Sequence, residues 1–186
     1  MAIEEKILPG LVLLADPFLT DPNFKRTVIL LSEIQDKGFV GFILNRRLNL
    51  NLGDAIPELQ SVDSPLYYGG PVQTDTMHFF HKMGNKIKGS IEIVDGIFWG
   101  GDFDQVKEML LDGSAEAEDF RFYLGYAGWD KEQLVKELKD KSWMLEKGTF
   151  SHVFAESNEG LWKYILNKKG GKYAIISGFP EDPLLN

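Results

Sequence analysis

The sequence predicts a single domain of the mixed α+β class over residues 1–186. Short apolar runs separated by turn residues dominate the first half of the chain, and amphipathic helical patterns dominate the second half. The length is that of one ordinary domain, which buries about 70% of the surface that its unfolded chain exposes. No internal repeat and no low-complexity linker divides the sequence.

The composition indicates a globular protein and excludes several function classes. Apolar residues make up 44% and charged residues 26%, and 20 Lys and Arg against 28 Asp and Glu give a net charge of −8. Because there is no cysteine, disulfide scaffolds, thiol nucleophiles, thiolate zinc sites and cysteine-held iron–sulfur clusters are excluded. The negative charge disfavours direct binding to nucleic acids, which would need a strong local basic patch.

The first apolar run, Leu11 to Ala15, predicts a buried strand rather than a signal peptide, since Glu4 and Glu5 precede it. No window approaches the roughly 18 apolar residues of a membrane span. We therefore expect no membrane contact and a cytoplasmic location.

Turn residues divide the following segments into predicted hairpins. Thr27 to Leu31 and Phe39 to Leu44 flank a turn cluster at residues 35–38. Two-residue turns at Gly84-Asn85 and Asp95-Gly96 predict an antiparallel meander over about residues 75–100. Its expected strands are Met77 to Met83, Lys86 to Ile87, Ile91 to Val94 and Ile97 to Trp99.

Capping residues delimit the predicted helices. A short helix is expected over Asn51 to Leu59, although the residue before Pro57 is biased away from helical geometry. The remaining helices are expected to run from Asp102 to Gly113, from Asp130 through Leu138, and from Ser157 to Gly170. On the second of these, Glu132 with Lys136 and Glu137 with Lys141 have the spacing of ion pairs. Tyr173 to Ile176 is rich in aromatic and β-branched residues, and it predicts a final strand.

The search for catalytic motifs finds no phosphate-binding loop, dinucleotide fingerprint, metalloprotease helix or nucleophile elbow, so the sequence predicts no cofactor. His78 and His81, with His152 farther along, are the candidate metal ligands. In the strand expected around them, His78 and His81 point to opposite faces of the sheet, where one metal ion cannot reach both. We therefore expect no metal site and interpret them as partly buried sheet residues.

Arg46 and Arg47 follow a predicted buried strand. A guanidinium there can clamp a carboxylate or phosphate, or it can pair with a neighbouring acidic residue. Two glycine-aromatic stretches, at residues 67–71 and 125–129, allow close backbone approaches; they form either a packed corner around Trp129 or a ligand site. The candidate ligand-binding residues are Asn45, Arg46, Gly69, Gly70, Gly125, Tyr126, Gly128 and Trp129.

An ordered set of motifs gives the chain a family resemblance. The motifs are Gly10 to Pro17 with Phe24 and Arg26, Gly41 to Arg46, Gly69 to Val72, Leu124 to Trp129 with Gln133-Leu134 and Glu137-Leu138, then Trp143 and Trp162. In this order and spacing they resemble the AlgH/YqgE family of small bacterial proteins, over nearly the whole chain. The sequence departs from the family pattern at Arg47, where Pro is usual, and at Glu132, where Gly commonly precedes Gln.

The resemblance implies a bent, bifurcated and mostly antiparallel sheet that closes into a pseudo-barrel, with helices packed outside. It also implies a cytoplasmic protein and a role in transcriptional regulation, but no established enzymatic activity. Three functions remain open: a binding or regulatory module for a small molecule or protein, a DNA-binding regulator, and a hydrolase-like enzyme using His81 or a carboxylate. The binding module is favoured because glycine-aromatic surfaces suit recognition and because no nucleophile-base pair is visible in the sequence.

Overall fold

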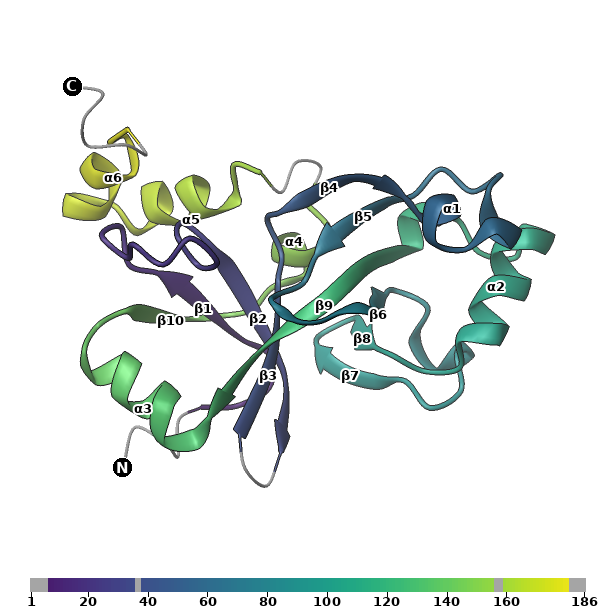
Figure 1. Ribbon diagram of the computed structural model, residues 1–186, viewed down its shortest axis with the longest axis horizontal. Helices are drawn as coiled ribbons and strands as arrows, with labels where there is room; N and C mark the ends of the chain where they lie inside the picture. The colour runs from purple at the N-terminus through teal and green to yellow at the C-terminus, as the bar shows by residue number, and fades with distance from the viewer. Residues whose placement is uncertain (1–6, 36–37, 156–158, 181–186) are drawn as a thin grey trace.

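The computed structural model describes residues 7–35, 38–155 and 159–180 and has the predicted α+β architecture (Figure 1). The strands are β1 (Leu11–Ala15), β2 (Val28–Gln35), β3 (Gly38–Ile43), β4 (Arg47–Asn51), β5 (Pro65–Tyr68), β6 (Val72–His81), β7 (Ile91–Val94), β8 (Ile97–Trp99), β9 (Phe120–Asp130) and β10 (Trp143–Lys147). The α-helices are α1 (Leu52–Ala55), α2 (Phe103–Asp112), α3 (Lys131–Lys139), α4 (Phe150–Val153), α5 (Leu161–Lys169) and α6 (Gly171–Ser177). Short 3-10 helices are η2 (Pro57–Leu59), η3 (Gly84–Lys86) and η4 (Ala117–Asp119).

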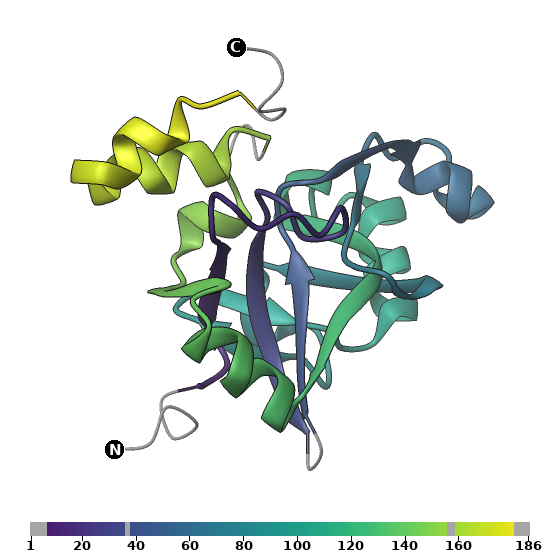
Figure 2. The same cartoon turned by 60° about the vertical axis from the view of Figure 1, so that its left-hand side comes forward.

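The strands form one curled sheet in the order β10-β1-β2-β3-β9-β6-β8-β7, and β4 joins it through β5. All described pairings are antiparallel except that of β5 with β9. Figures 1 and 2 show the sheet curving around its own interior with helices outside it. The expected class, a bent and mostly antiparallel sheet covered by helices, is confirmed.

The sheet forks along β9, the longest strand. The second half of β9 pairs with β3 from Gly38↔Asp130 to Gly41↔Ala127, whereas its first half pairs with β5 from Leu66↔Phe122 to Tyr68↔Leu124. Since β6 occupies the opposite edge of β9 along its first half, β3 and β5 must share one edge in succession. Their divergence makes the fork.

Two hydrophobic clusters lie on opposite sides of this forked sheet. The larger one contains β1 to β3 and receives Trp162 and Leu166 of α5 and Leu134 of α3. The smaller one receives Leu52 of α1 and Val106 of α2. Burying amphipathic helix faces against both sides of the sheet supplies the main stabilisation, at about 25 cal/mol per Å² of apolar surface.

Several local predictions are confirmed. β1 has the predicted bounds, β2 and β3 pair as a hairpin whose turn residues 36–37 lie outside the described residues, and β7 and β8 form the hairpin at Asp95-Gly96. Asp102 caps α2 by accepting from the amides of Asp104 and Gln105, and Gly113 ends that helix with φ 76°. α5 ends at Gly170, whereas its predicted start at Ser157 lies outside the described residues.

Other predictions are wrong. Lys86 belongs to η3 rather than to a strand, and β8, not β7, lies beside β6, so residues 75–100 are not a simple meander. Tyr173 to Ile176 lies in α6, where it packs on α5, and is not a strand. The helix expected over Asn51 to Leu59 is broken into α1 and η2 at Ile56, whose φ of −132° and ψ of 94° are extended, as Pro57 requires.

Candidate functional site

Asn45 and Arg46 hold the loop before β2 rather than facing an open site. The Asn45 side chain accepts from the amide of Val28 and donates to the carbonyl of Arg26, both at 2.9 Å. The Arg46 guanidinium donates to the carbonyls of Pro22 and Lys25 at 3.0 and 3.3 Å. These bonds satisfy backbone groups of an irregular loop, which is a structural task.

The two glycine stretches meet where the sheet forks. Gly69 donates its amide to the Leu124 carbonyl and accepts from the Ile43 amide, at 2.8 and 2.9 Å, so it joins β9 to β3. A Cβ on Gly125, which has φ +68°, would lie 2.5 Å from the carbonyl oxygen of Gly70. These glycines therefore allow two backbones to touch, and no ligand can enter between them.

Tyr126, Gly128 and Trp129 do line a hollow, which we call the aromatic hollow. It has a volume of about 300 Å³ and lies over β3, β9 and the start of α3. It is lined by Gly38, Phe39, Val40, Val72, Tyr126, Gly128, Trp129, Asp130 and Gln133. Three of the eight predicted ligand-binding residues thus line one hollow, while the other five serve the fork and its adjoining loop.

Trp129 is buried beneath this surface, and its indole forms a hydrogen bond that the sequence does not predict. Its indole N–H donates to Glu137 of α3 at 3.0 Å, and Trp143 of β10 donates to the same oxygen at 2.7 Å. Glu137 forms no ion pair with Lys141 among the described residues, contrary to the helix-spacing prediction, and Glu132 likewise forms none with Lys136. The spacing rule describes exposed helix faces, whereas Glu137 points between two tryptophans.

The histidines lie on opposite faces of β6, as expected. His78 packs against Phe42 with ring centroids 5.0 Å apart, while His81 stacks on Phe98 at 5.7 Å. The His81 side chain has no exposed surface; its Nδ1 accepts from the Met83 amide and its Nε2 lies 3.2 Å from the Gly100 carbonyl. Burial lowers the pKa of both imidazoles, which favours their neutral forms. Within the described ranges, no three metal-binding side chains gather.

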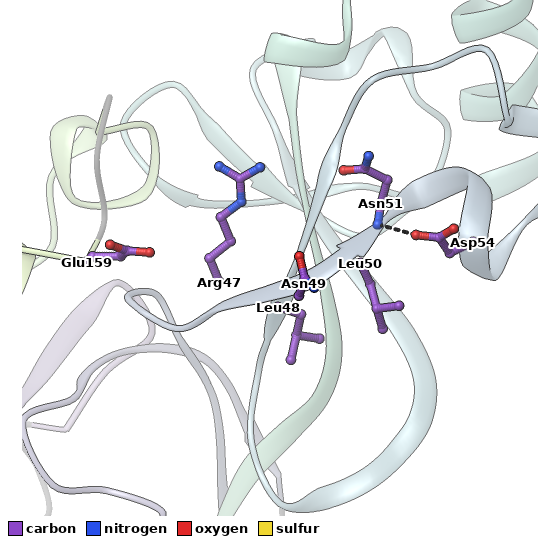
Figure 3. A pocket seen from close by; sticks show the side chains of 7 residues that line it. All are labelled: Arg47, Leu48, Asn49, Leu50, Asn51, Asp54 and Glu159. Atoms are coloured by element: carbon purple, nitrogen blue, oxygen red, sulfur yellow. Dashed lines mark hydrogen bonds between the residues drawn. The ribbon is translucent and has the colours of Figure 1, made fainter.

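A second and larger hollow, the β4 pocket, lies over β4 and was not predicted. Its volume is about 460 Å³, and its lining is Arg47, Leu48, Asn49, Leu50, Asn51, Asp54 and Glu159 (Figure 3). Asp54 accepts from the Asn51 amide at 2.7 Å and thereby caps α1. The polar and apolar residues of β4 alternate, which is the signal that could have marked this strand.

Comparison with known proteins gives extended similarity. The model of the AlgH-like family matches residues 12–174. A "UPF0301 protein" of Chlorobium limicola is 43% identical over 182 residues, covering 98% of this chain and 97% of the relative. One of Bacteroides fragilis is 40% identical over 178 residues, covering 95% and 90%.

Two solved structures have the same fold. The solution structure of the AlgH protein from Pseudomonas aeruginosa aligns with a TM-score of 0.70 and 28% identity, covering 92% of this chain and 93% of that one. A Corynebacterium diphtheriae protein aligns with a TM-score of 0.76 and 22% identity, covering 93% of each chain. No helix in the described ranges is long and apolar enough to span a membrane. The family match and the relatives together show that this chain belongs to the AlgH-like, UPF0301 family, whose function is uncharacterised.

Proposed function

We propose that this protein is a non-enzymatic binding module of the cytoplasm, that residues 1–186 act as one domain, and that its ligand occupies the aromatic hollow. The observation that carries the proposal is the exposed backbone of Gly128 beside the Tyr126 ring, in a hollow of about 300 Å³. That volume is at the lower end of the range for small-molecule pockets. The pairing of β1 with β10 supports one domain, since it joins distant parts of the chain.

The lining indicates a small ligand with a flat, apolar ring. Val72 supplies exposed apolar surface above the nearly buried Phe39 and Val40, and the missing side chain at Gly128 leaves room for a ring beside Tyr126. Gln133 also lines the hollow, and its side-chain amide can bond a polar substituent. Aromatic rings prefer offset or edge-on contacts, and such a contact contributes about 0.5–1.5 kcal/mol beyond its burial.

The alternative functions have less support. A hydrolase-like enzyme using His81 would need a free ring nitrogen, yet both nitrogens of His81 face backbone groups and the side chain is buried. A DNA-binding transcriptional regulator would need a basic recognition element, and the net charge of −8 opposes that role. If regulation is the cellular role, we propose that it acts through the bound ligand.

The test is a titration of the protein with planar aromatic probes: indole, tryptophan, adenosine and guanosine, followed by amide NMR shifts and thermal melting. At least one probe should shift the amides of residues 126–133 and raise the melting temperature. Gly128→Val should abolish that binding, since its side chain would fill the hollow; the position is exposed, and a Cβ there makes only ordinary contact, 3.5 Å from Tyr126.

The control is Ile91→Val, an exposed position on β7, which should bind probes like the unaltered protein. The melting temperature of Gly128→Val should be no lower than that of the unaltered protein. A loss of binding in this variant can then not be attributed to a loss of folding. The proposal is wrong if no probe perturbs residues 126–133 at about 10 mM, a concentration that detects even millimolar affinity. It is also wrong if Gly128→Val binds as well as the unaltered protein.

A further inference from the structure

The β4 pocket is a polar hollow separate from the aromatic hollow. Its lining comes from β4, from Asp54 of α1 and from Glu159 before α5, whereas the aromatic hollow lies on β3, β9 and α3. Among the described residues β4 pairs with β5 alone, which leaves its other edge open, and four of its five residues are exposed. Figure 1 shows β4 at the border of the sheet, and five of the residues that line the pocket belong to this strand.

Alternation along β4 gives the pocket a polar wall. Figure 3 shows Arg47 and Asn51 extending from one side of the strand, and Leu48 and Leu50 from the other. Asn49 lines the pocket as well, in the part of β4 where the pairing with β5 is irregular. Leu48 packs against the smaller hydrophobic cluster, which fixes the polar side outward.

Of the two adjacent arginines, Arg46 and Arg47, it is Arg47 whose guanidinium is available to a ligand. The side chain of its neighbour Arg46 donates to the carbonyls of Pro22 and Lys25, whereas in the described part of the chain the Arg47 side chain forms no hydrogen bond and no ion pair. A free guanidinium presents a planar fork of donors that matches a carboxylate. The structure therefore places an available carboxylate receptor at one side of the pocket.

Glu159 supplies the opposite charge. It lines the same pocket as Arg47, but no ion pair within 4.0 Å joins the two residues, and both are exposed. The other carboxylate, that of Asp54, is committed to the Asn51 amide. Glu159 is thus the acceptor available for a ligand ammonium. The side-chain amides of Asn49 and Asn51 can each donate to and accept from other polar groups of the ligand.

We propose that the β4 pocket binds a small zwitterion, a molecule with one carboxylate and one ammonium group, such as a free amino acid or a dipeptide. Arg47 holds its carboxylate, Glu159 holds its ammonium, and Asn49 and Asn51 bond its polar side chain or peptide group. Either charge alone would leave one of these receptors without a partner. The volume of about 460 Å³ accommodates either ligand.

The experiment is a calorimetric and NMR titration of the full chain with glutamine, glycyl-glutamine, N-acetylglutamine and glutamine amide. Glutamine or glycyl-glutamine should bind and shift the amides of residues 47–51. N-acetylglutamine lacks the ammonium and the amide derivative lacks the carboxylate, so each should bind at least about tenfold more weakly. Whether glutamine or glycyl-glutamine binds more tightly distinguishes a free amino acid from a dipeptide as the ligand.

Arg47→Gln and Glu159→Gln should each weaken this binding by about tenfold or more, while Arg47→Lys, which retains charge without the fork, should have an intermediate effect. Lys136→Gln and Glu118→Gln make the same charge changes at exposed positions on other elements, and they should leave binding unchanged. Since all four positions are exposed, the variants should melt like the unaltered protein.

Three results would overturn the proposal. The first is no binding of either zwitterion at about 10 mM. The second is equal binding of N-acetylglutamine, or of acetate or inorganic phosphate alone, which would mean a simple anion site. The third is binding that survives Arg47→Gln and Glu159→Gln. The Gly128→Val variant should bind the zwitterion normally, so this proposal and that of the aromatic hollow can fail separately.

Discussion

Trp129 and Trp143 donate their indole N–H groups to the same carboxylate oxygen of Glu137, at 3.0 and 2.7 Å. Their rings meet edge to face with centroids 5.9 Å apart, and both are nearly buried, at 4% exposure. The other oxygen of Glu137 accepts from Gln133 at 2.9 Å. One carboxylate thus joins α3 to both β9 and β10.

Glu137→Ala should destabilise the protein by about 2–4 kcal/mol, because it leaves two buried indole donors without an acceptor. Glu137→Gln keeps an acceptor oxygen but loses the charge, so we expect the free energy of unfolding to fall by about 1 kcal/mol. Urea unfolding measures both. Glu132→Ala, on the exposed side of α3, is the control and should change stability by less than about 0.5 kcal/mol. Equal effects of the two alanine substitutions would contradict the shared-acceptor interpretation.

Gly125→Ala should cost about 1–3 kcal/mol, since Gly125 has φ +68° and an added Cβ would lie 2.5 Å from the Gly70 oxygen. Gly128→Ala should instead stabilise by about 0.4–1 kcal/mol, because its backbone suits any residue and the unfolded chain loses freedom. Thermal melting of the two variants compares two glycines three residues apart in β9. If both substitutions are neutral, the backbone contact at the fork is not close.

Stability should fall as the pH drops below about 6.5. Burial lowers the pKa of His78, His81 and His152 from the ordinary value of 6.5. Below pH 6.5 the unfolded chain therefore binds more protons than the folded chain. The stability that is fully present above pH 6.5 is lost as the pH falls through the lowered pKa values of the folded state. Urea titrations at pH 7.5 and 5.5 measure the difference.

His81→Phe should reduce this pH dependence, since phenylalanine can stack on Phe98 but does not titrate. NMR titration of the imidazole rings measures the pKa of each histidine directly. A His81 ring that titrates at 6.5 or above would contradict the argument, because its Nδ1 accepts from the Met83 amide and could not also carry a proton there.

Trp162→Ala should destabilise by about 3–5 kcal/mol. The indole is 3% exposed, donates to the Ala15 carbonyl at 2.9 Å, and lies under the Arg26 guanidinium at 5.1 Å. Trp162→Phe keeps a ring but loses the donor, so a smaller loss is expected. A urea midpoint unmoved by Trp162→Ala would mean that α5 does not depend on this ring for its attachment to β1.

Local patterns in the sequence predicted those elements that local chemistry controls. The Asp102 cap and Gly113 end of α2 and the Asp95-Gly96 hairpin depend on residues adjacent in the chain, and both are confirmed. β9 was missed because Gly125 and Gly128 resemble a loop. It is a strand because both of its edges are paired with distant segments, information that no window of a sequence contains.

The same reasoning explains the outcome for α6 and for the candidate site. Tyr173 to Ile176 has strand propensity, but packing on α5 outweighs a preference of about 1 kcal/mol or less. The glycine stretches could be singled out by composition, whereas the meeting of Gly70 with Gly125 depends on tertiary structure. Arg46 and Arg47 look equivalent in sequence, and only the position of the Pro22 loop separates their tasks.

The forked strand β9 also has a kinetic consequence. β9 contacts strands that begin at residues 38, 65 and 72, so its pairing requires closure of long loops before either hydrophobic cluster is complete. The central amide protons of β9 should therefore exchange with solvent only through global unfolding, while those of α6 exchange through local opening. The strand that carries the glycines would thus be the last part of the sheet to open.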